Sequence, residues 1–271
     1  MHIKDKIASN VYINAPQKDC EKSFGAAMSE SSASALLSNA ALAGVEWDRT
    51  PLKAVGGYST RLLIVRHGES LGNAHRVFLG HTDKDLSERG YAQAYRTAEF
   101  LSYEKIDAVY SSDLLRAYNT ALPHARLRGL SVVSDTCLRE IYAGDWENRT
   151  VEEIIDMWGD EYLVGWRKHF GTYTIPGGES VLNLAERIDR AVLNIARENE
   201  GKTVLIACHA AAIRSFFGRI FGIAPEELAG QLAFPTNASV STVYFDGERL
   251  VPGEYSHDAH LVDLLGENPH K

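Results

Sequence analysis

Three short clusters of side chains carry the residue types that phosphoryl chemistry needs. They are Arg66-His67-Gly68, Ser111-Ser112-Asp113 with Arg116, and Cys208-His209. Guanidinium groups bind phosphate oxygens in a bidentate manner, and a neutral imidazole is able to attack phosphorus. Two arginines and two histidines brought to one place would therefore suit the cleavage of a phosphate ester.

Each cluster directly follows a segment that the sequence predicts to be a buried strand. The segments are the apolar or β-branched runs at residues 61–65, 106–110 and 203–207. Stretches with helical spacing of apolar residues separate them. Because ligands bind at the carboxyl ends of strands in alternating α/β folds, we expect all three clusters to face one crevice.

The order of predicted elements indicates an α/β fold. We expect a three-layer sandwich: a mostly parallel central sheet with one antiparallel strand, helices on both faces and a small helical cap over the site. Residues 1–57, with their Ser-rich and Ala-rich stretches, are predicted to be a partly disordered or loosely docked N-terminal extension. The sequence leaves open whether Met28 is the true start. The α/β domain spans 58–271, with the cap at about 148–176.

Local signals predict several element boundaries. Thr150 with Glu153 forms a capping box, and Ser180 caps a long helix. Asp113 is expected to be the N-cap of the helix after it, and Pro123 to bend or restart that helix. A closing hairpin is predicted over 240–251. The histidines at 257, 260 and 270 are interpreted as parts of a polar tail.

Composition limits the classes of partner. The formal net charge is −8 and the pI about 5.7, which argues against nucleic acid and favours a small phosphorylated metabolite. Three widely spaced cysteines argue against a disulfide framework, and no signal peptide or membrane-spanning run is evident. We therefore expect a cytoplasmic protein with no membrane partner. The oligomeric state stays open, a homodimer included.

No cofactor or metal is predicted. The sequence has no Gly-x-x-x-x-Gly-Lys-Ser/Thr loop for nucleotide phosphates and no acidic cluster suited to magnesium. In a metal-independent reaction, the arginines would offset the negative charge of the phosphoryl group.

A cysteine-dependent mechanism is the rival interpretation. Cys208 followed by Arg214-Ser215 satisfies a Cys-x5-Arg-Ser pattern. That chemistry needs a loop whose backbone N–H groups surround the phosphate, whereas the intervening residues lack glycine and favour a helix. We therefore interpret Cys208 as a small buried residue at a strand end.

The segment Leu63–Ser70, followed by Asn73 and Gly80, resembles the signature of the histidine phosphatase superfamily, in its phosphoglycerate mutase-like branch. The resemblance covers roughly residues 60–265 and continues through 110–116, 138–141, 144–147, 176–180 and the segment around His209. It implies that residues 58–271 form a histidine phosphatase domain.

The resemblance also implies a role for each site residue. His67 would be the nucleophile, Glu140 the general acid and base, and Arg66, Arg116 and His209 the groups that bind the phosphoryl oxygens. The positions expected to contact substrate are Gly68, Asn73, Leu79, Gly80 and Ala210. Two of these positions depart from the family: the residue at position 210 is often glycine in relatives but is alanine here, and the residue at position 79 is often polar but is leucine here. Leu79 would make the substrate side of the pocket more apolar.

The resemblance leaves three activities to weigh. Phosphoglycerate mutases carry added basic residues after the acid/base glutamate. Here Arg149 is the only basic residue soon after Glu140, and acidic residues follow it. A hydrolase that acts through a phosphohistidine is therefore favoured over a mutase. A non-catalytic phospho-ligand sensor is disfavoured because such members usually lose the nucleophile or the acid, and this chain keeps His67 and Glu140. Specificity is expected from Leu79, His81 and the stretch 150–175.

Overall fold

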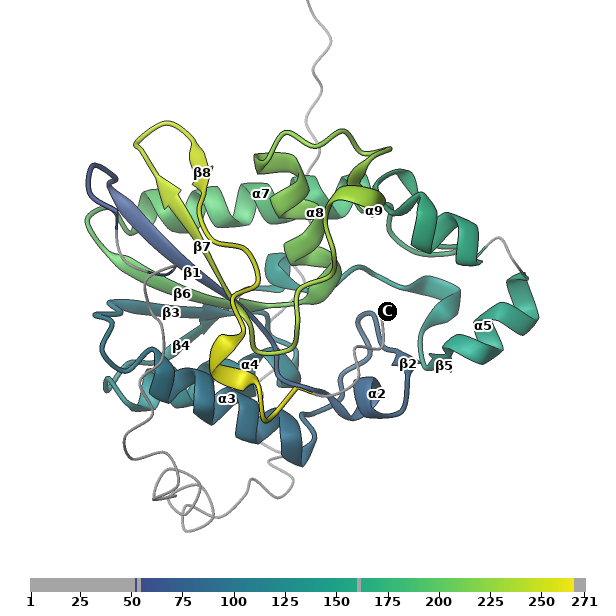
Figure 1. Ribbon diagram of the computed structural model, residues 1–271, viewed down its shortest axis with the longest axis horizontal. Helices are drawn as coiled ribbons and strands as arrows, with labels where there is room; N and C mark the ends of the chain where they lie inside the picture. Colours follow the sequence, from purple (N-terminus) through teal and green to yellow (C-terminus); the bar gives the residue numbers. More distant parts are fainter. Residues whose placement is uncertain (1–51, 53–54, 160–161, 266–271) are drawn as a thin grey trace, which may run out of the picture. The chain divides into compact units, whose positions relative to one another are not determined.

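A mixed sheet lies at the centre of the computed structural model, which describes residue 52 and residues 55–159 and 162–265. Its strands are β1 (Thr60–Arg66), β3 (Ala108–Ser111), β4 (Val132–Ser134), β6 (Thr203–Cys208), β7 (Val240–Phe245) and β8 (Leu250–Pro252). They are ordered β4-β3-β6-β1-β7-β8 (Figure 1). The first four are parallel, and β7 pairs antiparallel with β1 and with β8. The predicted sheet and its closing hairpin are confirmed.

Alternate strand residues supply two cores, because successive side chains of a strand point to opposite faces. Leu62 and Ile64 of β1 pack with α7 (Val181–Glu198) and α8 (Ala210–Ile220). Leu63 and Val65 pack on the other face with α3 (Glu88–Phe100) and α4 (Leu115–Arg126). Figure 1 shows the two helix pairs on opposite sides of the sheet. The three predicted layers are therefore present.

Smaller elements lie beside the carboxyl ends of the parallel strands. They are α2 (Leu71–Ala74), β2 (Val77–Phe78), β5 (Arg149–Thr150), α5 (Val151–Trp158) and α9 (Leu228–Gln231). α5 begins at Thr150 with the predicted capping box, and Ser180 accepts a bond from the Asn183 N–H at the start of α7. A π-helical turn, Leu163–Lys168, and a 3-10 turn, Phe170–Thr172, complete the helical segment drawn in teal at the right of Figure 1.

The helix α4 does not restart at Pro123, and the prediction that Asp113 is its N-cap is wrong. The helix runs through Pro123 to Arg126, because Ala121 and Ala125 are buried in the core on either side and offset the lost backbone hydrogen bond. The N-cap is Leu114, without a side-chain cap. Asp113 instead accepts two hydrogen bonds from the Arg139 guanidinium, at 2.7 and 2.5 Å, so an ion pair takes the carboxylate away from the helix terminus.

The C-terminal histidines do not form a polar tail. His257 is 9% and His260 1% exposed, and both stack on Phe100, with ring centroids 5.5 and 4.3 Å from it. Burial lowers the pKa of His260 to about 3, with the neighbouring His257 adding to the effect. His124 of α4 is fully buried, and its pKa is likewise lowered to about 3 by burial. His270 lies outside the described residues.

Most of the predicted N-terminal extension also lies outside the described residues. Leu52 is described and is 1% exposed in the core beneath α3 and α4, and the Arg61 guanidinium donates to its carbonyl oxygen. All described residues fall in one compact unit, Asn39–Lys271. The domain boundary at 57/58 stays a prediction. Across the described ranges, no helix is both long and apolar enough to cross a membrane.

Candidate active site

The carboxyl ends of the parallel strands border a pocket of about 840 Å³, counting space open to solvent. Eight of the ten predicted site residues line it: Arg66, His67, Asn73, Leu79, Gly80, Arg116, Glu140 and Ala210. His209 is fully buried behind this lining, with its ring centroid 5.2 Å from that of His67. Gly68 is also outside the lining. The clusters that follow the predicted strands therefore meet at one place.

His67 is held in a single orientation at the end of β1. Its backbone N–H donates to the Cys208 carbonyl oxygen at 2.9 Å, and its Nδ1 lies 2.6 Å from the Gly68 carbonyl oxygen. Because a carbonyl oxygen can only accept, Nδ1 carries the proton of the neutral ring. The lone pair is then on Nε2, the nitrogen that a nucleophile would use.

His209 follows β6 directly and is the N-cap residue of α8. Burial lowers its pKa well below the usual value, and the nearby Arg116 and His67 add to the shift. Neither ring nitrogen has a hydrogen-bond partner within the described part of the chain. A buried polar group without a partner is costly, so this ring is suited to a ligand that supplies one.

Two buried arginines flank the histidines. Arg66 is 1% and Arg116 2% exposed. Burial lowers the pKa of each to about 10, Glu140 opposes the shift in both, and both remain cationic at neutral pH. Arg116 donates to the Gly80 and Thr82 carbonyl oxygens, and Arg66 donates to the Pro235 carbonyl oxygen while its Nε has no partner among the described residues. These contacts fix the two positive charges beside the pocket.

The Glu140 carboxylate lies against the N-terminus of α8. It accepts backbone N–H groups from Ala211 and Ala212, both at 3.1 Å, and from Ile141 at 2.9 Å. The positive end of the helix dipole favours a negative charge there. The same helix start presents Ala210 to the pocket. α8 therefore orients the carboxyl group that the sequence predicted as the acid.

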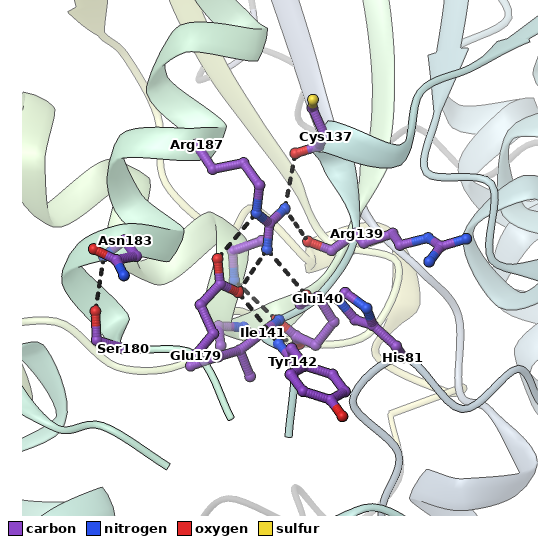
Figure 2. A network of polar contacts seen from close by, with 12 residues as sticks. His81, Cys137, Arg139, Glu140, Ile141, Tyr142, Glu179, Ser180, Asn183 and Arg187 are labelled. Atoms are coloured by element: carbon purple, nitrogen blue, oxygen red, sulfur yellow. Dashed lines mark hydrogen bonds and ion pairs between the residues drawn. The ribbon is translucent and has the colours of Figure 1, made fainter. Parts of the chain in front are cut away.

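Arg187, in α7, forms hydrogen bonds with the segment that carries Glu140 (Figure 2). Its guanidinium donates to the carbonyl oxygens of Cys137, Arg139 and Glu140 at 2.9, 2.9 and 3.2 Å. It also binds both carboxylate oxygens of Glu179, at 3.1 and 2.8 Å. All five N–H donors of the guanidinium are thus used. This network holds the backbone on both sides of Glu140.

Asn73 and Gly80 line the pocket, whereas His81, from which specificity was expected, does not. Asn73 Oδ1 accepts the Ser70 N–H in the capping box of α2, and Asn237 Nδ2 lies 3.3 Å from it. Gly80 has φ of +52°, and a Cβ there would collide with Ala143. His81, placed near the site by the sequence, has its Nε2 2.8 Å from the Glu140 carbonyl oxygen.

Cys208 and Arg214 are poorly placed for cysteine chemistry. Burial raises the pKa of the Cys208 thiol to about 12, so the thiolate is absent at neutral pH. Arg214 lies 4.2 Å from the Phe234 ring centroid and donates to the Leu232 carbonyl oxygen. Neither residue lines the pocket, and the segment between them is the helix α8 rather than a phosphate-binding loop.

Sequence reasoning missed much of the pocket wall. Phe78, Trp166 and Phe234 line it, as do Arg76 and Arg167, whereas Arg149 does not. Phe78 precedes Leu79 in the chain and could have been found from that neighbour. Arg76 lies three residues after Asn73 and could have been found in the same way, and Trp166 and Arg167 fall in the stretch 150–175 from which specificity was expected. Phe234 lies far from these segments in the sequence and carries no local signal. The described residues contain no group of three or more His, Cys, Asp or Glu side chains able to hold a metal ion.

Comparison with known proteins finds relatives named as phosphatases and as phosphoglycerate mutase-like proteins. Phosphoserine phosphatase 1 of Hydrogenobacter thermophilus is 31% identical over 208 residues, which is 76% of this chain and 97% of that protein. Phosphoglycerate mutase-like protein 4 of Arabidopsis thaliana is 34% identical, over 74% of this chain and 87% of that protein. The solved structure of Bacillus stearothermophilus YhfR is 28% identical with a TM-score of 0.71, and the match covers 75% of this chain and all of that one.

The family comparison agrees with the geometry. The model of the histidine phosphatase superfamily, branch 1, matches residues 62–256, which begin in β1 and end after β8. That span contains all the predicted site residues and both faces of the sheet. The chain belongs to the histidine phosphatase superfamily, branch 1.

Proposed function

We propose that the chain is a phosphomonoesterase that hydrolyses a small phosphorylated metabolite through a phosphohistidine on His67. The proposal is supported by one arrangement in the pocket. Nδ1 of His67 is bound to the Gly68 carbonyl oxygen, which leaves Nε2 for attack, and two buried arginines line the same pocket. The arginines supply the positive charge that a metal would otherwise supply, so the reaction needs none. The expected compartment is the cytoplasm.

In the first step, Nε2 of His67 attacks phosphorus and the ester P–O bond breaks. Glu140, entering as the carboxylic acid, gives its proton to the leaving oxygen, which departs as an alcohol. Arg66 and Arg116 bind the equatorial oxygens. A phosphoryl dianion beside His209 also favours protonation of that ring, which then donates to the phosphoryl group.

In the second step, water attacks the phosphoryl group on His67. The Glu140 carboxylate takes a proton from this water, the P–N bond breaks, and inorganic phosphate leaves. Glu140 is then protonated and His67 neutral, as at the start. The α8 N–H groups that contact Glu140 support this role by holding its carboxyl group in place.

Phosphoglycerate mutase activity is the second candidate. Arg76 and Arg167 line the pocket, and cations at such positions are able to hold a second anionic group. Arg76 is already paired with Glu152, at 3.4 Å. The relatives carry both phosphatase and mutase names, so a mutase assay belongs beside the hydrolysis assay.

The test is hydrolysis of p-nitrophenyl phosphate in EDTA by the wild type, His67→Ala and Cys208→Ser. We expect His67→Ala to lose about 10⁴-fold or more in kcat, and Cys208→Ser to stay within about threefold. Wild type quenched in alkali during turnover should carry acid-labile phosphate on the peptide that contains His67. Loss of activity in Cys208→Ser, or mutase activity alone, would contradict the proposal.

A further inference from the structure

The pocket has two chemically different halves. Arg66, His67 and Arg116 form the phosphoryl half. The opposite half has mainly apolar side chains, supplied by β2, the segment 151–166 and the loop before β7: Phe78, Leu79, Val151, Tyr162, Trp166 and Phe234. We call this second group the aromatic wall.

The aromatic wall is fixed by its own packing. Trp166 and Tyr162 are each only 3% exposed. The Trp166 ring meets Phe78 edge-on at 5.2 Å and stacks with Phe234 at 6.0 Å between centroids. Interlocked aromatic rings lose little conformational entropy when a ligand arrives, so the surface is ready to contact an apolar group.

The charged side chains that line this half are exposed to solvent. Arg76 is 55% exposed and paired with Glu152, and Arg167 is also exposed. A leaving group with an ammonium and a carboxylate, such as serine, would lose water against the rings and gain few hydrogen bonds in return. An apolar leaving group would instead bury its surface there.

Resting on the proposed hydrolysis, we propose that the aromatic wall is a leaving-group subsite for apolar, ring-bearing alcohols. The preferred substrates are then phosphomonoesters of such alcohols rather than phosphoserine or phosphoglycerate. Because Leu79 is part of this subsite, the subsite also gives a physical reason for an apolar side chain at that position. Phe78 and Phe234 are only partly buried, so they are the rings that such a leaving group touches.

The test compares kcat/KM for 2-phenylethyl phosphate, O-phospho-L-serine and 3-phosphoglycerate in EDTA. All three release an alkyl alcohol, so a preference for the first reports binding rather than an easier leaving group. We expect that preference to be about tenfold or more, from burial of the ring. Phosphoserine or 3-phosphoglycerate hydrolysed as well or better would overturn the subsite while leaving the proposed function intact. If none of the three esters and no p-nitrophenyl phosphate is hydrolysed, the proposed function is refuted, and the subsite is refuted with it.

Two variants and a control locate the preference. Phe78→Ala should lower the ratio of phenylethyl to phosphoserine kcat/KM by about tenfold, because it removes a ring of the wall. Val151→Thr keeps the shape and adds a hydroxyl, so it should lower the same ratio even if Phe78→Ala folds poorly. Phe221→Ala, on a ring that is 41% exposed and outside the pocket, should leave the ratio unchanged. Equal ratios in all four proteins would refute the subsite.

Discussion

The molecule buries two groups of histidines in different ways. His67 and His209 follow neighbouring strands beside two cationic arginines and a pocket. His257 and His260 stack on Phe100 of α3 and are outside the pocket lining. In both groups burial lowers a histidine pKa. A buried neutral imidazole is therefore not by itself a sign of catalysis. The neighbouring cations and the pocket make the difference.

The largest expected effect separates the groups by activity. His209→Ala removes a ring whose nitrogens have no hydrogen-bond partner among the described residues, so the folded protein loses packing but no hydrogen bond. We expect kcat to fall by about 10²- to 10⁴-fold because the phosphoryl group loses a donor. Steady-state kinetics and a melting curve on the same sample would measure both effects. A large drop in melting temperature with normal kcat would show that His209, like His257 and His260, has only a structural role.

The reverse result is expected for His260→Ala. The substitution removes the stack with Phe100 and leaves a cavity, so the free energy of unfolding should fall by about 2–4 kcal/mol. The variant should keep kcat within about threefold at a temperature where it is folded, because the residue lies outside the pocket lining. Urea titration and kinetics at low temperature would check this. A catalytic defect without loss of stability would break the comparison.

The buried histidines outside the pocket, among them His124 of α4, should also make stability depend on pH. His124 and His260 have pKa values of about 3 in the folded state, against 6.5 as the ordinary value. Between these values the unfolded chain binds more protons, so stability falls as pH drops below about 6.5, by up to about 1.4 kcal/mol per pH unit for each histidine. Urea midpoints at pH 7 and pH 5 would measure the slope. His260→Phe should flatten it, and an unchanged slope would argue against His260 as a source.

The smallest expected effect among the site residues is at Arg187, whose five guanidinium N–H groups all donate to the segment around Glu140 or to Glu179. Arg187→Gln frees the backbone around Glu140, so we expect kcat to fall by about tenfold with a smaller change in KM. Arg187→Lys should not rescue kcat, because an ammonium lacks the planar fork. The pH profile of kcat would report the misplaced acid. A variant that only melts earlier would reduce Arg187 to a stabilising residue.

The sheet and the phosphoryl half of the pocket were predictable because local signals specify both. The run before His67 is buried on both faces, and the residue types that bind phosphate follow the strand ends. Parallel pairing of β1, β3 and β6 then brings those ends together. No contact between distant segments had to be known in advance.

The failures all depend on contacts between segments distant in sequence. Asp113 binds Arg139 instead of capping its helix, and Phe100 turns an apparent polar tail into core. Phe234 reaches the pocket through the packing of Trp166 and Arg214, neither of which is close to it in sequence. Propensity and spacing describe a residue's own segment, and they carry no information about such partners.

Gly68 and Gly90 meet with no side chain between them, where α3 contacts the loop that follows His67. A Cβ on Gly68 would overlap with the Gly90 carbonyl oxygen, and a Cβ on Gly90 with the Glu69 carbonyl oxygen. One added methyl group on α3, well away from any ligand, would thus push directly on the loop that anchors Nδ1 of His67. A side chain at either position would therefore displace the loop that follows His67 through backbone contacts alone, without altering any catalytic side chain.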